Sequence, residues 1–241
     1  MQPISNRDRL IVALDFPDIH SAKNLVEVLG DEVVFYKIGL ELLMSGDYFK
    51  MIDWLAKKNK KVFADLKLYD ISATVSKAVK NLSSYPNIHF LTIHSASKDI
   101  MQQACENKGK INILAVTVLT NLDQKDLNQM GFDPQISLET LVIKKAKLAA
   151  ESGVDGVVAS GLEAKIIRQT LGKDLTIVAP GIRLENVDQI NSDDQKRVVD
   201  VKTAFLNGVS YIVVGRPINS SSNPLLAAQN FQKEISDCSF L

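Results

Sequence analysis

The feature that most constrains the fold is a regular alternation of short apolar runs with longer amphipathic stretches along the 241 residues. The short runs are rich in Val, Ile and Leu and have the length of strands, whereas the longer stretches repeat apolar residues at helical spacing. The sequence predicts strands at 10–15, 33–39, 61–67, 88–94, 112–119, 156–160, 176–181 and 211–215. It predicts helices at 21–30, 49–59, 74–84, 97–107, 137–152, 163–172, 199–208 and 223–236.

Strands this apolar are typical of sheets that helices cover on both faces, and strand–helix alternation favours right-handed crossovers between parallel strands. Eight such units in a chain of this length predict an α/β fold in which residues 1–241 form a single (β/α)8 TIM barrel domain. An open, doubly wound sheet is the alternative, because alternation alone does not show closure. No GxGxxG follows the first expected strand, which disfavours dinucleotide binding.

Composition narrows the classes of partner. Lys and Arg total 28, and Asp and Glu also total 28, so the formal net charge is zero. This balance argues against a nucleic-acid partner. The two cysteines, Cys105 and Cys238, have neither disulfide-framework nor zinc-site spacing. No stretch reaches 18 uninterrupted apolar residues, and the first residues lack the apolar core of a signal peptide. We therefore expect a cytoplasmic protein with no membrane partner.

The run VFADLKLYD, residues 62–70, places charge where a strand should end. Asp65 and Lys67 are two residues apart, so a regular strand directs them to the same side, where an unpaired charge is costly. Lys37, at the end of the preceding expected strand, can face Asp65, and Asp70 lies just beyond the strand. Catalytic groups in such barrels lie at the carboxyl ends of the strands. A purely structural salt-bridge cluster is the alternative.

A second motif is VGRP at 214–217, together with PGIR at 180–183. A glycine directly after a strand lets a phosphate approach backbone N–H groups, and Arg216 can add a charge-assisted contact. Phosphate sites commonly follow the last two strands of barrels of this kind. The two motifs together predict a phosphate site.

These residues carry a resemblance to the orotidine 5'-phosphate decarboxylase family, which extends from ALD near residue 15 to VGRPI near residue 218. Asp65, Lys67, Asp70 and the following Ile71 match the family's DxKxxD signature. Six further segments occur in the family's order, namely FYKIG, VTVLT, VVASG, APGIR, DQKR and VGRPI.

The resemblance implies decarboxylation of orotidine 5'-monophosphate to uridine 5'-monophosphate in de novo pyrimidine synthesis, without cofactor or metal. It implies that Lys67 protonates C6, and that the catalytic set is Lys67, Asp65, Asp70 and Lys37. It implies a homodimer with shared active sites, in which Asp70, accompanied by Thr74, serves the neighbouring subunit. It implies substrate contacts from Asp15, Lys37, Thr74, Thr120, Arg183, Gln195, Gly215 and Arg216.

Two departures and two alternatives accompany the resemblance. His94 lacks the glycine that often follows it and is given no catalytic role, and Asn223 replaces a more usual aspartate as the expected helix cap. A magnesium-dependent sugar-phosphate decarboxylase of the same superfamily is one alternative, but Lys37 stands where that enzyme has an acidic metal ligand. A catalytically inactive, nucleotide-binding barrel is the other, and it predicts losses in the DxKxxD set, which is intact.

Overall fold

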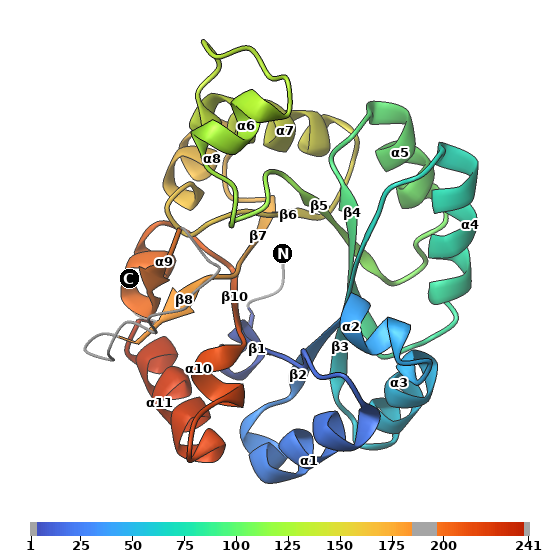
Figure 1. The fold of residues 1–241 in the computed structure, drawn as a ribbon, viewed down its shortest axis with the longest axis vertical. Coiled ribbons are helices and arrows are strands. Elements are labelled where there is room, and N and C mark those ends of the chain that lie inside the picture. The colour runs from blue at the N-terminus through green and yellow to red at the C-terminus, as the bar shows by residue number, and fades with distance from the viewer. Residues whose placement is uncertain (1–3, 185–196, 239–241) are drawn as a thin grey trace.

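The parallel strands close into a barrel in the computed structural model, which describes residues 4–184 and 197–238 (Figure 1). Closure is completed where β1 pairs with β2 on one side and with β10 on the other. This confirms the predicted TIM barrel and rules out the open sheet. The barrel strands in the described residues are β1 (Leu10–Ala13), β2 (Phe35–Gly39), β3 (Lys61–Leu68), β4 (Ile88–His94), β5 (Asn112–Val116), β6 (Gly156–Val158), β7 (Thr176–Ala179) and β10 (Tyr211–Val214).

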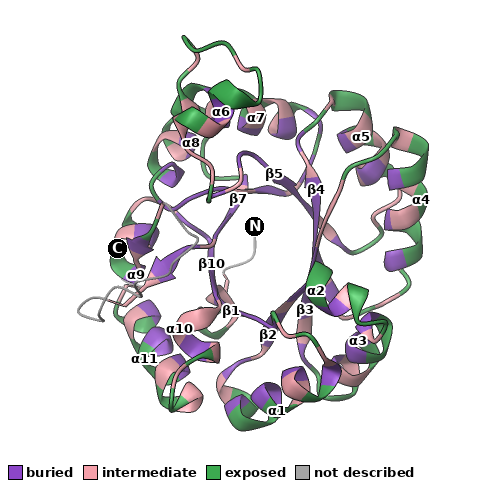
Figure 2. Cartoon of the chain, in the orientation of Figure 1, coloured by how far each residue is buried: buried purple, intermediate pink, exposed green. Residues whose placement is uncertain are grey.

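Helices surround the ring of strands, and their buried faces point toward it (Figure 2). No helix in the described ranges combines the length and the apolar character needed to cross a membrane. The α-helices found in these ranges are α1 (Ile19–Leu29), α2 (Leu40–Met44), α3 (Tyr48–Lys57), α4 (Ser72–Leu82), α5 (Lys98–Glu106), α6 (Gln124–Gln129), α7 (Leu138–Glu151), α8 (Ala164–Leu171), α9 (Val201–Leu206), α10 (Arg216–Asn219) and α11 (Pro224–Asp237). The 3-10 helices are η1 (Asn6–Arg9) and η2 (Gly30–Glu32).

The core has two layers because successive residues of a strand point to opposite faces. In β1, Leu10 and Val12 pack in the larger cluster with the helices, whereas Ile11 and Ala13 pack in the barrel interior. The interior cluster consists of Ile11, Ala13, Phe35, Phe63, Phe90, Leu114, Val178, Tyr211 and Val213. The barrel interior is therefore filled by side chains, so a ligand site has to lie outside this cluster.

Short elements that the sequence did not predict lie mainly at the carboxyl ends of the strands. They include α2, α6 and α10, together with a separate two-stranded sheet of β8 (Ile182–Arg183) and β9 (Val199–Asp200). The helix expected at 199–208 starts later, because Val199 and Asp200 pair with β8. Asp200 instead caps α9 by accepting a hydrogen bond from the Thr203 amide. The expected cap at Asn223 is confirmed, since its side chain accepts from the Leu226 amide.

Candidate active site

Polar side chains replace the apolar filling at the carboxyl ends of β2, β3 and β4. Each of these strands contributes a phenylalanine to the interior cluster, at positions 35, 63 and 90. Two residues further along come Lys37, Asp65 and Thr92, which the two-residue period directs to the same side. The site therefore rests on the apolar interior of the barrel.

Asp65 is the centre of this polar group. Its Oδ1 accepts a hydrogen bond from Lys67 Nζ at 2.9 Å and another from Thr92 Oγ1 at 2.9 Å. Its Oδ2 lies 3.5 Å from Lys37 Nζ, which is 2.8 Å from Oδ1 of Asp15. The alternating carboxylates and ammoniums of Asp15, Lys37, Asp65 and Lys67 balance each other's charge, and the expected approach of Lys37 to Asp65 is present.

Burial and ion pairing act in opposite directions on these groups. Burial by itself raises the pKa of Asp65, but Lys37 and Lys67, with hydrogen bonds from Lys67 and Thr92, outweigh it and lower the pKa. Burial likewise tends to lower the pKa of Lys37, whereas Asp65 and Asp15 raise it above its ordinary value. Both groups are therefore held in their charged forms at neutral pH.

Lys67 reaches this position through a bulge in β3. Ala64 pairs with Leu91 of β4, but the next paired residues are Leu68 and Ile93. Lys67 has a φ of 47°, in the left-handed region, which costs an L-residue roughly 1–2 kcal/mol. The Asp65–Lys67 contact thus depends on an irregular strand rather than on the regular alternation from which the sequence predicted it.

A cavity of about 370 Å³ opens above the polar group, which is within the range of small-ligand sites. Asp15, Lys37, Asp65 and Lys67 lie on one side, and apolar side chains such as Val158 are also present. Residues from the loops after β5, β7 and β10 complete the described lining: Val118, Leu119, Thr120, Asn121, Pro180, Gly181, Arg183, Gly215, Arg216 and Pro217. The cavity unites both sequence motifs.

Two arginines line the end of the cavity formed by the loops after β7 and β10. Burial, and then the neighbouring guanidinium of Arg216, lower the pKa of Arg183. Gly215 also lines the cavity, and because it has no side chain its backbone forms part of the wall. Two guanidiniums and an accessible backbone suit a phosphate group.

The comparisons with known proteins agree with this geometry. The sequence model of the "Orotidine 5'-phosphate decarboxylase / HUMPS family" matches residues 8–231. This chain belongs to that family. An orotidine 5'-phosphate decarboxylase of Methylococcus capsulatus is 52% identical over 236 residues, which are 98% of this chain and 95% of that protein.

Two further orotidine 5'-phosphate decarboxylases match this chain over nearly its whole length. The orotidine 5'-phosphate decarboxylase of Xanthomonas axonopodis pv. citri is 46% identical over 97% of this chain and 94% of its own length. The crystal structure of orotidine 5'-phosphate decarboxylase from Lactobacillus acidophilus superimposes with a TM-score of 0.82 at 32% identity. That likeness covers 95% of this chain and 99% of the Lactobacillus chain.

Three residues predicted from the family pattern are not part of the described cavity lining. Asp70 lies beyond β3, where its Oδ1 accepts a hydrogen bond from the Ile71 amide at 2.7 Å. Neither it nor Thr74, in the first turn of α4, lines the cavity among the described residues. Gln195 lies outside the residues that the structure describes.

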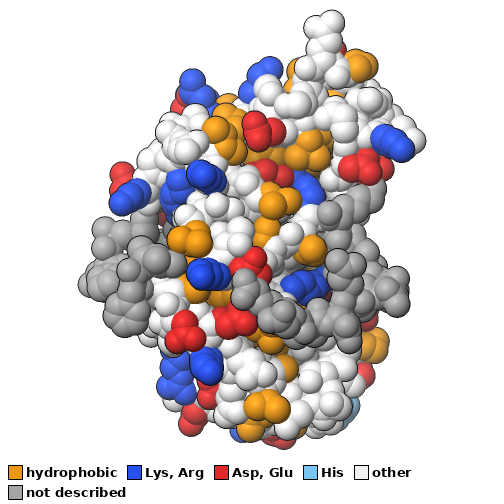
Figure 3. Space-filling view, turned by 90° about the vertical axis from the view of Figure 1, so that its left-hand side faces the viewer, with side chains coloured by type: hydrophobic (Ala, Val, Ile, Leu, Met, Phe, Trp, Pro, Cys, Tyr) orange, Lys and Arg blue, Asp and Glu red, His pale blue; other side chains and the backbone are white. Residues whose placement is uncertain are grey.

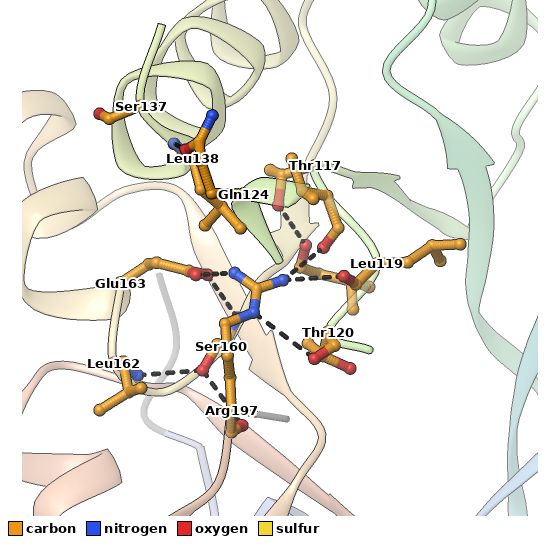
Figure 4. A network of polar contacts seen from close by, with 12 residues as sticks. Thr117, Leu119, Thr120, Gln124, Ser137, Leu138, Ser160, Leu162, Glu163 and Arg197 are labelled. Atoms are coloured by element: carbon orange, nitrogen blue, oxygen red, sulfur yellow. Dashed lines mark hydrogen bonds and ion pairs between the residues drawn. The ribbon is translucent and has the colours of Figure 1, made fainter. Parts of the chain in front are cut away.

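A buried ion pair behind the cavity was not predicted from the sequence. The guanidinium of Arg197 contacts the Glu163 carboxylate and donates to the carbonyls of Val118 and Leu119 at 3.3 and 2.8 Å (Figure 4). Glu163 Oε2 accepts from the Ser160 amide at 2.9 Å. Arg197 was only part of the DQKR motif, and nothing in the sequence pairs it with Glu163. The ion pair joins the loop after β6 to the segment before β9, and the hydrogen bonds of Arg197 add the loop after β5.

Proposed function

We propose that this chain decarboxylates orotidine 5'-monophosphate to uridine 5'-monophosphate, in de novo pyrimidine synthesis, with Lys67 as the proton donor. Membership of the family supports the reaction, as do two relatives at 46–52% identity that are orotidine 5'-phosphate decarboxylases. The observation that carries the role of Lys67 is its 2.9 Å contact with Asp65 at the edge of the cavity. The remaining assignments follow the match of each residue to the family pattern.

The chemistry requires stabilisation of a localised charge. When the bond from C6 to the carboxylate breaks, the electron pair stays on C6 in the plane of the ring and carbon dioxide leaves. The pyrimidine π-system does not delocalise this pair well, so a nearby positive charge has to stabilise it. The Lys67 ammonium supplies that charge and then donates a proton from Nζ to C6.

The environment of Lys67 suits a proton donor. The carboxylate of Asp65 lies 2.9 Å from the Lys67 ammonium as its ionic partner, whereas a Schiff-base lysine has to attack as the neutral amine. Lys37, held between Asp15 and Asp65, orients the Asp65 carboxylate from the opposite side. In the proposal, Asp15 and Lys37 also hold the ribose hydroxyls, and Thr120 contacts the pyrimidine.

The phosphate is assigned to Arg183, Gly215 and Arg216, with Gln195 included on the family pattern alone. Binding energy from this remote group can be used to assemble the reacting end of the site. Accordingly, orotidine without its phosphate should lose turnover as well as affinity. An Arg216→Ala variant should lose most of the advantage of the phosphorylated substrate, which comparison of kcat/KM for the two substrates would measure.

The magnesium-dependent alternative is disfavoured by what surrounds the carboxylates. Asp15 and Asp65 are the acidic side chains that line the cavity among the described residues, and both contact the ammonium of Lys37. A second cation would be repelled from that position. The proposal includes no metal and no organic cofactor, so turnover should be unchanged after exhaustive treatment with EDTA.

The direct test follows the loss of the orotidine 5'-monophosphate chromophore. Wild type should turn over, Lys67→Ala should lose nearly all activity, and Lys50→Ala should match wild type, because Lys50 is an exposed residue of α3. Both variants should still bind uridine 5'-monophosphate. An inactive wild type, or a Lys67→Ala variant that keeps its rate, would contradict the proposal.

The proposal also includes a homodimer with shared active sites. Asp70 and Thr74 lie outside the cavity of their own chain, which supports a contribution to the site of a second copy. Large apolar side chains are exposed close to Asp70, since Tyr69 and Ile71 are 72% and 71% exposed. An apolar surface of this kind favours burial against another subunit.

The remaining proposals concern domain organisation and location. The matched span of residues 8–231 supports one catalytic domain over the chain. Lys, Arg, Asp and Glu side chains are intermixed on the face shown in Figure 3, and the net charge is zero, which supports the absence of a nucleic-acid partner. The proposed role in pyrimidine synthesis goes together with a cytoplasmic location and no membrane partner. Cys105 and Cys238 are free cysteines, which is compatible with a reducing compartment.

A further inference from the structure

Thr92 was not among the predicted site residues, yet its side chain contacts the Asp65 carboxylate and the backbone amide of Lys67. Its hydroxyl accepts a hydrogen bond from the Lys67 amide at 2.9 Å and donates one to Asp65 Oδ1 at 2.9 Å. The side chain is completely buried. A hydroxyl has one hydrogen and two lone pairs, so one oxygen can make both bonds at once.

The bulge explains why the Lys67 amide needs this partner. Between the paired residues Ala64 and Leu68, β3 has three residues, whereas Thr92 alone lies between the corresponding residues of β4. The Lys67 amide is thereby removed from the regular ladder of backbone hydrogen bonds. The Thr92 hydroxyl takes the place of the missing backbone acceptor, so no buried donor is left unpaired.

The same hydroxyl fixes the carboxylate that holds the lysine. Asp65 Oδ1 accepts from Thr92 Oγ1 and from Lys67 Nζ, both at 2.9 Å. The hydrogen bonds therefore form a closed circuit that leaves Lys67 at its amide, passes through Thr92 and Asp65, and returns to Lys67 at Nζ. Both ends of this one residue are held by the same three-residue arrangement.

We propose that Thr92 is a positioning residue for the proton donor, which holds Lys67 in its left-handed conformation and Asp65 in the orientation that directs Nζ into the cavity. The proposal rests on the function assigned above to Lys67. Thr92 itself is behind Asp65 and is not among the described residues that line the cavity. Its effect on the reaction is therefore exerted through the two residues that it contacts.

Substitutions of similar volume separate the hydroxyl from the shape of the side chain. Thr92→Val removes both hydrogen bonds, whereas Thr92→Ser keeps the hydroxyl and loses a methyl group. We expect Thr92→Val to lower kcat roughly 10- to 100-fold, the effect of a small misplacement of a reacting group. Thr92→Ser should stay near the wild-type rate, and the affinity of both variants for uridine 5'-monophosphate should be unchanged.

Thr117→Val is the matched control. Thr117 is also a buried threonine at the end of a barrel strand, and its hydroxyl donates to the Val158 carbonyl at 2.9 Å. This substitution also removes a buried hydroxyl, but from a bond that involves neither Asp65 nor Lys67. The kcat of Thr117→Val should remain close to that of wild type. If Thr92→Val does not fold, Thr92→Cys replaces it, because a thiol forms only weak hydrogen bonds.

A crystal structure of Thr92→Val provides a readout that does not depend on the activity. We expect Lys67 to leave the left-handed region, or its contact with Asp65 to be lost. The proposal would be overturned if Lys67 kept both its left-handed conformation and its contact with Asp65. It would also be overturned if Thr92→Val had the wild-type kcat, or if Thr92→Ser lost as much kcat as Thr92→Val. A parallel loss of nucleotide binding would indicate a merely structural role and would also overturn it. If the wild-type protein showed no turnover, the proposed function would be refuted. The conformation of Lys67 in the Thr92→Val crystal structure would still test whether Thr92 positions Lys67.

Discussion

Asp65 shows how one residue links the stability of the site to its chemistry. Its carboxylate is buried with the ammoniums of Lys37 and Lys67, which, with hydrogen bonds, lower its pKa below the ordinary value despite the opposing effect of burial. A lowered pKa in the folded state contributes stability above the unfolded pKa of about 3.9. That contribution is lost as the pH falls through the lower pKa of the folded protein.

Replacement of this carboxylate should therefore have a pH-dependent cost. Asp65→Asn leaves the buried ammonium of Lys37 and the half-buried ammonium of Lys67 with one fewer anionic partner, and we expect a loss of about 3 kcal/mol in the free energy of unfolding at pH 7. The difference from wild type should shrink as the pH falls below about 4, because Asp65 then binds a proton in the unfolded chain, whereas the folded protein binds it only at its lower pKa. Urea unfolding of both proteins from pH 3 to pH 8 measures this difference in the free energy of unfolding. A difference that stays constant with pH would contradict the lowered pKa of Asp65.

The residues of the site were predictable to different degrees. Lys37, Asp65 and Lys67 could be found because a charge at the end of an apolar strand requires a partner, and the structure places all three together. Thr92 could not be found in this way, because threonine is a common residue of strands. Its contacts depend on the bulge between β3 and β4, and pairing irregularities leave no periodic signal in the sequence.

At the level of elements, long periodic segments were predictable and short ones were not. The eight barrel strands and the long helices follow the predicted alternation, because many residues contribute to each pattern. β8 and β9 have two residues each, and they form only because distant parts of the chain meet. The same limit applies to the Arg197–Glu163 pair, which joins loops whose proximity only the closed barrel determines.

This buried pair should stabilise the loops that form one wall of the cavity. Arg197→Met leaves the Glu163 carboxylate buried without its cationic partner, so we expect a loss of about 3–5 kcal/mol in the free energy of unfolding. Adding Glu163→Gln, which removes the charge, should restore part of that loss. Denaturant unfolding of both single variants and the double variant measures the coupling, and strictly additive effects would refute it.

At the scale of the whole molecule, barrel closure brings the sequence motifs into one cavity. Asp65 of the VFADLKLYD run and Gly215 of the VGRP motif are about 150 residues apart. They come close because β3 pairs with β2, and β1 pairs with both β2 and β10. The sequence could predict this meeting once closure was assumed. Asp70 and Thr74 are the exception, because closure of a single barrel leaves them outside the cavity lining.

A second subunit accounts for these two residues and yields the last prediction. In a dimer with shared sites, an Asp70→Ala chain retains Lys67, and a Lys67→Ala chain retains Asp70. Each homodimer should be inactive, whereas a hybrid dimer contains one site with both residues intact. Random exchange of equal amounts should therefore restore at most about a quarter of the wild-type activity. Activity is measured after exchange has been verified with differently tagged chains, and no recovery in verified hybrids would show that Asp70 acts in its own subunit.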